Sequence, residues 1–180
     1  MTGLRMAAAG LALLAGGCAM DGEVAVPGGG RSMAGHFTAT AVLRDARGAE
    51  IGTAAAKEAG GALRVTVEVS GLTPGLHGVH VHSAGKCDAP DFASAGGHWN
   101  PTGHQHGSMN PAGPHAGDLP NLSVAADGRG HIEFTLPGTY EGLLDQDGAA
   151  LVVHAGQDDL KTDPSGNSGG RVACGVFEAV

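Results

Sequence analysis

The sequence predicts an all-β protein, an eight-stranded antiparallel β-sandwich or barrel with two long functional loops. Three observations favour this class. Short stretches from residue 36 onward alternate apolar and polar residues, and turns rich in glycine, proline and aspartate separate them. No stretch of that region shows a convincing helical pattern.

Each predicted strand is justified by its alternation and by the turn that follows it. In ALRVTVEV, the residues Leu63, Val65, Val67 and Val69 lie on one face, and a Gly60-Gly61 turn precedes them. The core is built from Val, Leu and Ala, because the chain has one Trp, one Tyr and four Phe. The eight strands are expected at residues 36–45, 50–58, 62–69, 76–84, 121–126, 131–137, 149–155 and 171–180.

The N-terminus has the character of an export signal. Residues 1–17 form an apolar run too short to span a bilayer, which predicts a signal peptide. Cys18 follows at once, as in bacterial lipoproteins, where such a cysteine is lipidated; the alternative is an ordinary signal peptide whose removal also removes Cys18. Residues 18–34 are expected to form a flexible tether and residues 35–180 one domain. We therefore expect export to the periplasm or cell envelope, with membrane anchoring through lipid on Cys18.

The stretch GGHWNPTGHQHGSMNPAGPHAGD, residues 96–118, is the first long loop, and its glycines and prolines exclude a helix. Imidazoles interleaved with a carboxylate suit a cation such as zinc. Ordering one backbone residue costs roughly 1–2 kcal/mol, and a structural zinc can supply on the order of 10 kcal/mol. The alternative is a flexible, histidine-rich surface loop. The candidate ligands in this loop are His98, His104, His106, His115 and Asp118.

A second group of candidate metal ligands lies in the fourth predicted strand. Because side chains alternate along a strand, His80 and His82 project from one face, while Val79 and Val81 point into the core. For an isolated HxH pair, exposed surface histidines are the alternative. His77 lies an odd number of residues from both, so it is predicted on the opposite face of the strand. We therefore expect it to be a structural, hydrogen-bonding histidine.

The second long loop, residues 155–170, follows His154 and is polar and acidic, and Arg171 opens the last strand after it. Cys87 and Cys174 are expected to pair in an exported protein, the alternative being two buried thiols. Their disulfide would close a loop of about 88 residues, which is worth about 4 kcal/mol in the chain-entropy treatment.

Five segments in this order, GLHGVHVH, GGHWNP, HAGDLPN, LVVHAGQDD and GGRVACGVF, resemble the copper/zinc superoxide dismutase family. The resemblance spans about Gly35 to Val180. It implies a Greek-key β-barrel, copper and zinc as cofactors, and dismutation of superoxide to dioxygen and hydrogen peroxide by a bacterial exported form.

The resemblance also implies roles for single residues. His98 would bridge the two metals and take a proton during turnover, and Arg171 would attract the anionic substrate, so both are expected to be catalytic. Asp158 would link a copper histidine to a zinc histidine. His104 has no counterpart and would be a bystander or a competitor for zinc. The implied ligands are His80, His82, His98 and His154 for copper, and His98, His106, His115 and Asp118 for zinc.

Charge narrows the choice of partners. The net charge of −8 argues against nucleic acid, and an anionic substrate then needs a local positive patch such as Arg171 supplies. One alternative is a non-catalytic periplasmic copper- or zinc-binding module on the same fold, and another is a structural or adhesive β-sandwich. The complete set of implied ligands favours the enzyme. Whether the chain is a monomer or a homodimer stays open at this point.

Overall fold

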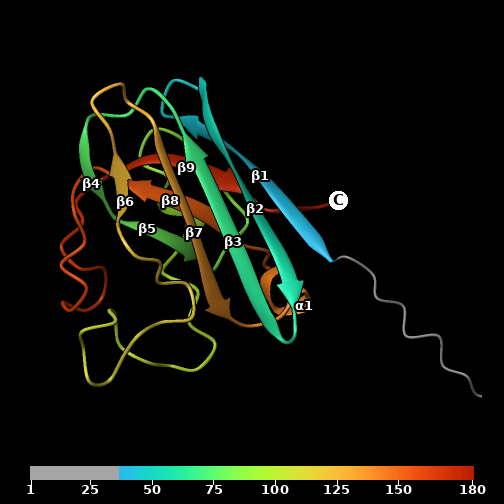
Figure 1. The fold of residues 1–180 in the computed structure, drawn as a ribbon. Coiled ribbons are helices and arrows are strands. Elements are labelled where there is room, and N and C mark those ends of the chain that lie inside the picture. The colour runs from blue at the N-terminus through green and yellow to red at the C-terminus, as the bar shows by residue number, and fades with distance from the viewer. Residues whose placement is uncertain (1–36) are drawn as a thin grey trace, which may run out of the picture. The chain divides into compact units, whose positions relative to one another are not determined.

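The computed structural model describes residues 37–180, so the predicted signal peptide, the site at Cys18 and most of the tether lie outside the described residues. The described part is an all-β domain, as predicted (Figure 1). A 3₁₀ turn at Ala93–Ala95 and the helix α1 at Tyr140–Leu143 are short additions. The strands are β1 (Thr38–Asp45), β2 (Glu50–Ala59), β3 (Ala62–Val69), β4 (Gly75–His77), β5 (Val79–His82), β6 (Leu122–Val124), β7 (Gly130–Pro137), β8 (Ala150–His154), β9 (Arg171–Val176) and β10 (Glu178–Ala179).

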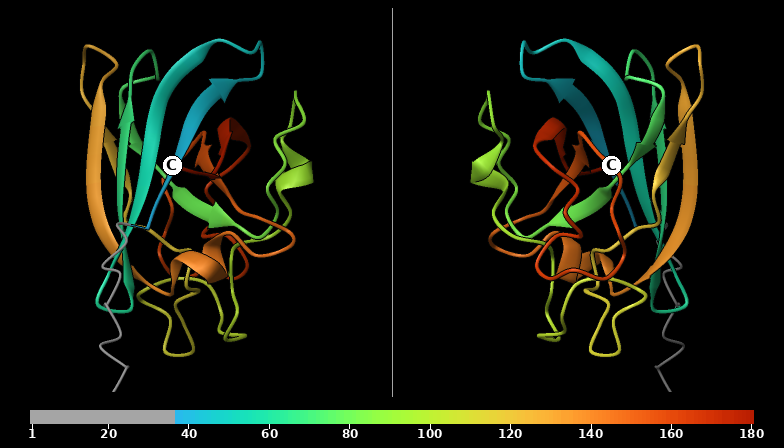
Figure 2. Two further views of the ribbon diagram at one scale, coloured as in Figure 1. Left: turned by 90° about the vertical axis from the view of Figure 1, so that its right-hand side faces the viewer. Right: turned by 90° about the vertical axis from the view of Figure 1, so that its left-hand side faces the viewer.

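All strand pairs are antiparallel, and the strands follow one another in the order β4-β6-β7-β3-β2-β1-β9-β8-β5, with β10 paired to β1. The two end strands, β4 and β5, are consecutive in the chain and are separated by Gly78 alone. The sheet therefore curls into a nearly closed antiparallel barrel (Figure 2). The long segment between β5 and β6 lies outside this barrel.

The structure corrects the predicted strand count, because two of the eight predicted strands are each divided in two. The strand at 76–84 divides at Gly78, since β4 pairs with β6 whereas β5 pairs with β8. A Cβ atom at Gly78 would lie 2.8 Å from the Cβ of Ser168, so a side chain does not fit there. The strand at 171–180 divides at Phe177, whose ring is buried in the core.

A small helical element also departs from the prediction. Helix α1 follows Thr139, whose Oγ1 accepts a hydrogen bond from the backbone N–H of Gly142 at 3.2 Å. Such a cap stabilises a single helical turn that is too short to show a periodic pattern. Within residues 37–180, none of the helices has the length and apolar character needed to cross a bilayer.

The core confirms the expected pattern of small apolar side chains. The inward residues of β3 are buried, and so are Val79 and Val81 on β5. Because strand side chains alternate, burial of these two valines turns the histidines between and after them to the outer face of the barrel. That outer face is where the metal centre is built.

The free edge of β5 is covered by two pieces of the first long loop. The N–H of Trp99 donates to the carbonyl of Val81 at 2.8 Å, and the N–H of Val81 donates to the carbonyl of Gly117 at 2.9 Å. A Cβ atom at Gly117 would overlap the Val81 carbonyl, so only glycine allows this approach. Backbone hydrogen bonds therefore position the loop, although it contains no strand of its own.

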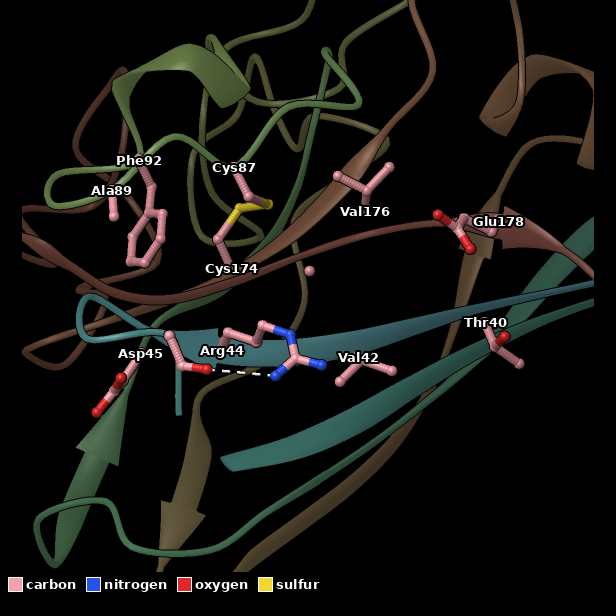
Figure 3. Close-up of a pocket in the computed structure, with 12 residues that line it drawn as sticks. Thr40, Val42, Arg44, Asp45, Cys87, Ala89, Phe92, Cys174, Val176 and Glu178 are labelled. Carbon is pink, nitrogen blue, oxygen red and sulfur yellow. Dashed lines mark hydrogen bonds between the residues drawn. A yellow bond between two sulfur atoms is a disulfide. The ribbon is translucent and has the colours of Figure 1, made fainter. Parts of the chain in front are cut away.

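The predicted disulfide between Cys87 and Cys174 is confirmed, with 5.6 Å between the Cα atoms. It ties the loop after β5 to β9. A groove lined by residues of β1, β9, the disulfide and Phe92 lies beside it (Figure 3). The lining residues come from the described part of the chain and include no histidine, so the groove is separate from the metal centre.

Candidate metal centre

The strand β5 and the loop that covers its edge bring the first candidate ligands together. His80 and His82 are buried, and the backbone pairs His82 with His98 and His80 with Asp118 across isolated antiparallel bridges. The rings of His80 and His98 stack with 3.9 Å between their centroids. Backbone pairing therefore places candidate ligands side by side that are 16 and 38 residues apart in the chain.

The first group consists of four imidazoles. One ligand atom from each of His80, His82, His98 and His154 lies within 4.8 Å of the others. Four nitrogens of these rings are buried and find no hydrogen-bond partner within residues 37–180: His80 Nδ1, His82 Nε2, His98 Nε2 and His154 Nε2. An unsatisfied buried polar atom costs about 1–3 kcal/mol, so four in one place are unfavourable without a ligand. A metal ion with imidazole ligands, such as copper, fits this arrangement.

The second group surrounds Asp118. A compact set of ligand atoms comes from His80, His98, His106 and Asp118. His115 joins it, because its Nδ1 lies 3.2 Å from Asp118 Oδ1 and 3.3 Å from His98 Nδ1. His98 Nδ1 lies 2.9 Å and His106 Nδ1 3.1 Å from the two Asp118 oxygens. Zinc bonds near 2.0–2.1 Å give tetrahedral edges of about 3.3 Å, so these spacings suit one zinc ion.

His98 belongs to both groups, with one ring nitrogen facing each. Its Nδ1 faces Asp118, and its Nε2 is the unpartnered atom of the first group. Burial lowers the pKa of His98. His98 therefore turns one nitrogen to each group, and to serve both groups as a ligand the neutral ring would also give up its remaining N–H proton.

Asp158 connects the two groups from behind. Its carboxylate is fully buried and accepts from His80 Nε2 at 2.7 Å and from His106 Nε2 at 2.9 Å. Burial disfavours its charge, but these hydrogen bonds outweigh burial and hold the pKa of Asp158 well below its usual range. Because an ionised carboxylate only accepts, both histidines carry a proton on Nε2, which leaves Nδ1 as the ring atom available to a metal.

Backbone carbonyls orient the other two rings of the first group. His82 Nδ1 donates to the Gly96 carbonyl at 2.9 Å, and His154 Nδ1 donates to the Gly169 carbonyl at 3.2 Å. These bonds leave Nε2 of each ring free, in agreement with the unpartnered atoms. Sequence reasoning missed both carbonyls, because a backbone acceptor has no signature in residue type.

The electrostatics of the first group favour neutral ligands. Burial lowers the pKa of His80 to about 3, of His82 to about 2 and of His154 to about 4. These rings are therefore uncharged at neutral pH, which is the form that binds a metal. Burial also opposes a charge on His106, but hydrogen bonds to two carboxylates outweigh it and raise the pKa of His106 to about 9. Metal binding at His106 Nδ1 would therefore release a proton.

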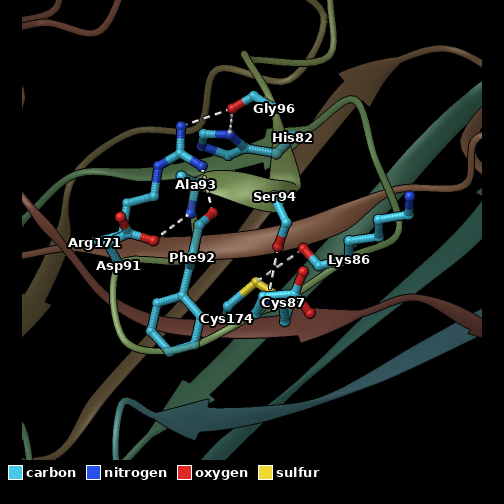
Figure 4. Close-up of a disulfide and its surroundings, with 11 residues drawn as sticks. His82, Lys86, Cys87, Asp91, Phe92, Ala93, Ser94, Gly96, Arg171 and Cys174 are labelled. Carbon is cyan, nitrogen blue, oxygen red and sulfur yellow. Dashed lines mark hydrogen bonds between the residues drawn. A yellow bond between two sulfur atoms is a disulfide. The ribbon is translucent and has the colours of Figure 1, made fainter.

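Arg171 lies at the start of β9, beside the first group. Its Nη1 donates to the Phe92 carbonyl and its Nη2 to the Gly96 carbonyl, each at 2.6 Å (Figure 4). The Gly96 carbonyl also accepts from His82, so one backbone oxygen connects the guanidinium to a histidine of the first group. Arg171 is only partly buried, which leaves a fixed positive charge open to solvent at the site.

Two further histidines from the sequence have other roles. His104 is exposed, belongs to neither group, and donates from Nδ1 to the Pro114 carbonyl at 3.1 Å. His77 is buried, and its ring nitrogens lie 2.7 Å from the His154 carbonyl and 2.8 Å from the Thr73 carbonyl. The prediction that His77 is structural is therefore confirmed, and His104 has the place of a bystander.

The comparisons with known proteins agree with this geometry. The family model described as copper/zinc superoxide dismutase matches residues 50–177. A Caulobacter vibrioides superoxide dismutase [Cu-Zn] is 43% identical over 149 residues, covering 78% of this chain and 86% of the relative. Superoxide dismutase [Cu-Zn] 1 of Aquifex aeolicus is 40% identical over 154 residues, covering 82% of this chain and 91% of the relative. A crystal structure of a SOD-like protein from Bacillus subtilis superposes with a TM-score of 0.73 at 40% sequence identity. The match covers 78% of this chain and 98% of the B. subtilis chain. With its barrel, its two groups of metal-binding side chains and these matches, the chain belongs to the copper/zinc superoxide dismutase family.

Proposed function

We propose that this chain dismutates superoxide, converting two superoxide anions and two protons into dioxygen and hydrogen peroxide. The observation that carries the proposal is the convergence of four buried, unpartnered imidazole nitrogens beside Arg171. We assign copper to His80, His82, His98 and His154, and zinc to His98, His106, His115 and Asp118. When bound, copper supplies one-electron redox chemistry and zinc a cation that does not change its oxidation state.

The protein supplies binding, orientation and a proton. Arg171 attracts and orients the anion, because its guanidinium is permanently charged and its two carbonyl contacts hold it in place. His98 takes up and delivers a proton at Nε2, the ring nitrogen without a hydrogen-bond partner in the described chain. Its Nδ1 lies 2.9 Å from Asp118 Oδ1, on the side where zinc would be held, so the second group would keep the ring oriented.

The activity is tested by measuring superoxide decay with purified protein loaded with copper and zinc. We expect one copper and one zinc per chain by elemental analysis. Arg171→Ala should keep the metal content, lower kcat/KM and weaken the dependence of the rate on salt, because one attractive charge is lost from the approach path. A fully loaded chain that does not accelerate superoxide decay would instead be a non-catalytic metal-binding module on the same fold.

The disulfide and the bacterial relatives indicate an exported protein, because disulfides persist in oxidising compartments. We propose further that residues 1–17 are a signal peptide, that Cys18 is lipidated, that residues 18–34 tether the domain, and that the domain occupies residues 35–180. Cys18→Ser should move the protein from the membrane fraction to the soluble periplasm. Wild-type protein that is wholly soluble, or that begins beyond Cys18, would contradict the anchor.

A further inference from the structure

The loop between the disulfide and the 3₁₀ turn places a negative charge next to the guanidinium of Arg171 (Figure 4). A cavity of about 520 Å³ opens there to solvent, and Arg171 is one of its lining residues. Its lining residues are Pro90, Asp91, Ala93, Gly169, Gly170 and Arg171. One carboxylate and one guanidinium therefore line the same surface cavity.

The carboxylate of Asp91 is held in place by its own loop. Its Oδ1 accepts a hydrogen bond from the backbone N–H of Ala93 at 3.1 Å. Between these two residues, the side chain of Phe92 is buried against the disulfide cluster and anchors the loop. Asp91 itself is exposed, so its charge faces the solvent of the opening.

Asp91 does not position Arg171. The terminal nitrogens Nη1 and Nη2 of Arg171 already donate to two backbone carbonyls. The influence of Asp91 on this arginine is through charge, and it opposes the lowering of the Arg171 pKa that burial causes. A change of charge at residue 91 should therefore alter the local potential without moving the guanidinium.

We propose that Asp91 is a specificity-determining residue for the dismutase reaction: its carboxylate weakens the positive potential at the opening and so selects a singly charged anion over a doubly charged one. The inference rests on the proposed function. A potential acts in proportion to the charge of the anion, so its effect on hydrogen phosphate is the square of its effect on superoxide. The cost to superoxide is a slower approach, and the gain is a larger relative exclusion of multivalent anions.

The test compares Asp91→Asn with Asp127→Asn in the copper- and zinc-loaded protein. The two residues are matched, because each is exposed and accepts a hydrogen bond from the backbone two residues on, and an asparagine keeps that acceptor. Each variant removes one negative charge from the chain. Asp127 lies in the turn between β6 and β7 and does not line the opening.

For a charge roughly 5–10 Å from the anion in water, we expect Asp91→Asn to raise kcat/KM for superoxide about two- to fourfold at low salt. The rate should also fall more steeply with added salt. Inhibition by hydrogen phosphate, measured near pH 8, should strengthen about four- to sixteenfold. Asp91→Asn that behaves like Asp127→Asn, or that changes superoxide and hydrogen phosphate by the same factor, would overturn the proposal.

A second readout does not depend on activity. Labelling of Arg171 by an uncharged arylglyoxal and by a carboxylate-bearing one is followed by mass spectrometry. Asp91→Asn should accelerate the anionic reagent more than the uncharged one, whereas Asp127→Asn should leave their ratio unchanged. Absence of dismutase activity in the loaded wild type refutes the proposed function, and an unchanged labelling ratio in Asp91→Asn refutes the role of Asp91.

Discussion

Replacement of Asp158 by asparagine tests how the two metal groups are linked. In the structure, Oδ1 accepts from both His106 Nε2 and the N–H of Leu160, and Oδ2 accepts from His80 Nε2 alone. An asparagine side chain has one acceptor oxygen, and we expect it to face His106 and Leu160, because that side has two donors. Its NH₂ group then faces the Nε2–H of His80, so two donors oppose each other.

His80 can respond by losing the hydrogen bond or by moving its proton to Nδ1, the atom that faces the first group. Either response weakens a ligand of the first group. An unsatisfied buried donor costs about 1–3 kcal/mol, and 1.4 kcal/mol is tenfold in affinity, so copper should bind about 5- to 150-fold more weakly. Zinc should be affected less, because His106 keeps its acceptor.

The assay is competition of the purified protein with chelators of known affinity, carried out separately for copper and for zinc. Asp159→Asn is the matched control, because it removes the same charge one residue away from an exposed carboxylate. The Oδ1 atom of Asp159 accepts hydrogen bonds from backbone N–H groups of the same loop, and an asparagine keeps that acceptor. Asp158→Asn that retains wild-type copper affinity, or that loses as much zinc affinity as copper affinity, would refute this account of the link.

The other predictions concern the loops around the metal centre. Gly166 has φ +63°, and a Cβ atom there would overlap the Asp158 carboxylate, so Gly166→Ala should lower Tm and release metal. Gly169→Ala, at φ +78° but with the nearest atom 3.8 Å away, should cost only the backbone strain of about 1–2 kcal/mol; equal metal loss from both variants would contradict this reasoning. Reduction of the Cys87–Cys174 bond should lower the free energy of unfolding by about 4 kcal/mol, measured by denaturant titration, and an unchanged midpoint would refute it.

Much of the fold could be predicted from local sequence pattern. Alternation along 62–69 placed the apolar side of β3 in the core, and the valines of β5 fixed the outward face of His80 and His82. Histidine and aspartate side chains in a glycine-rich loop indicated a metal, because ligand type belongs to the residue itself. The division of ligands between copper and zinc came from the family resemblance, since spacing alone does not distinguish one metal group from the other.

Only the tertiary structure decided how these parts meet. The division of a predicted strand at Gly78 depends on which neighbours pair with its two halves, and those neighbours are far along the chain. The carbonyls of Phe92 and Gly96 hold Arg171, yet no residue type marks a backbone oxygen as an acceptor. The nearness of Asp91 to Arg171 likewise arises from the folding of the disulfide loop against β9. Local sequence determines periodicity and ligand chemistry, whereas contacts between distant backbone groups exist only once the barrel has closed.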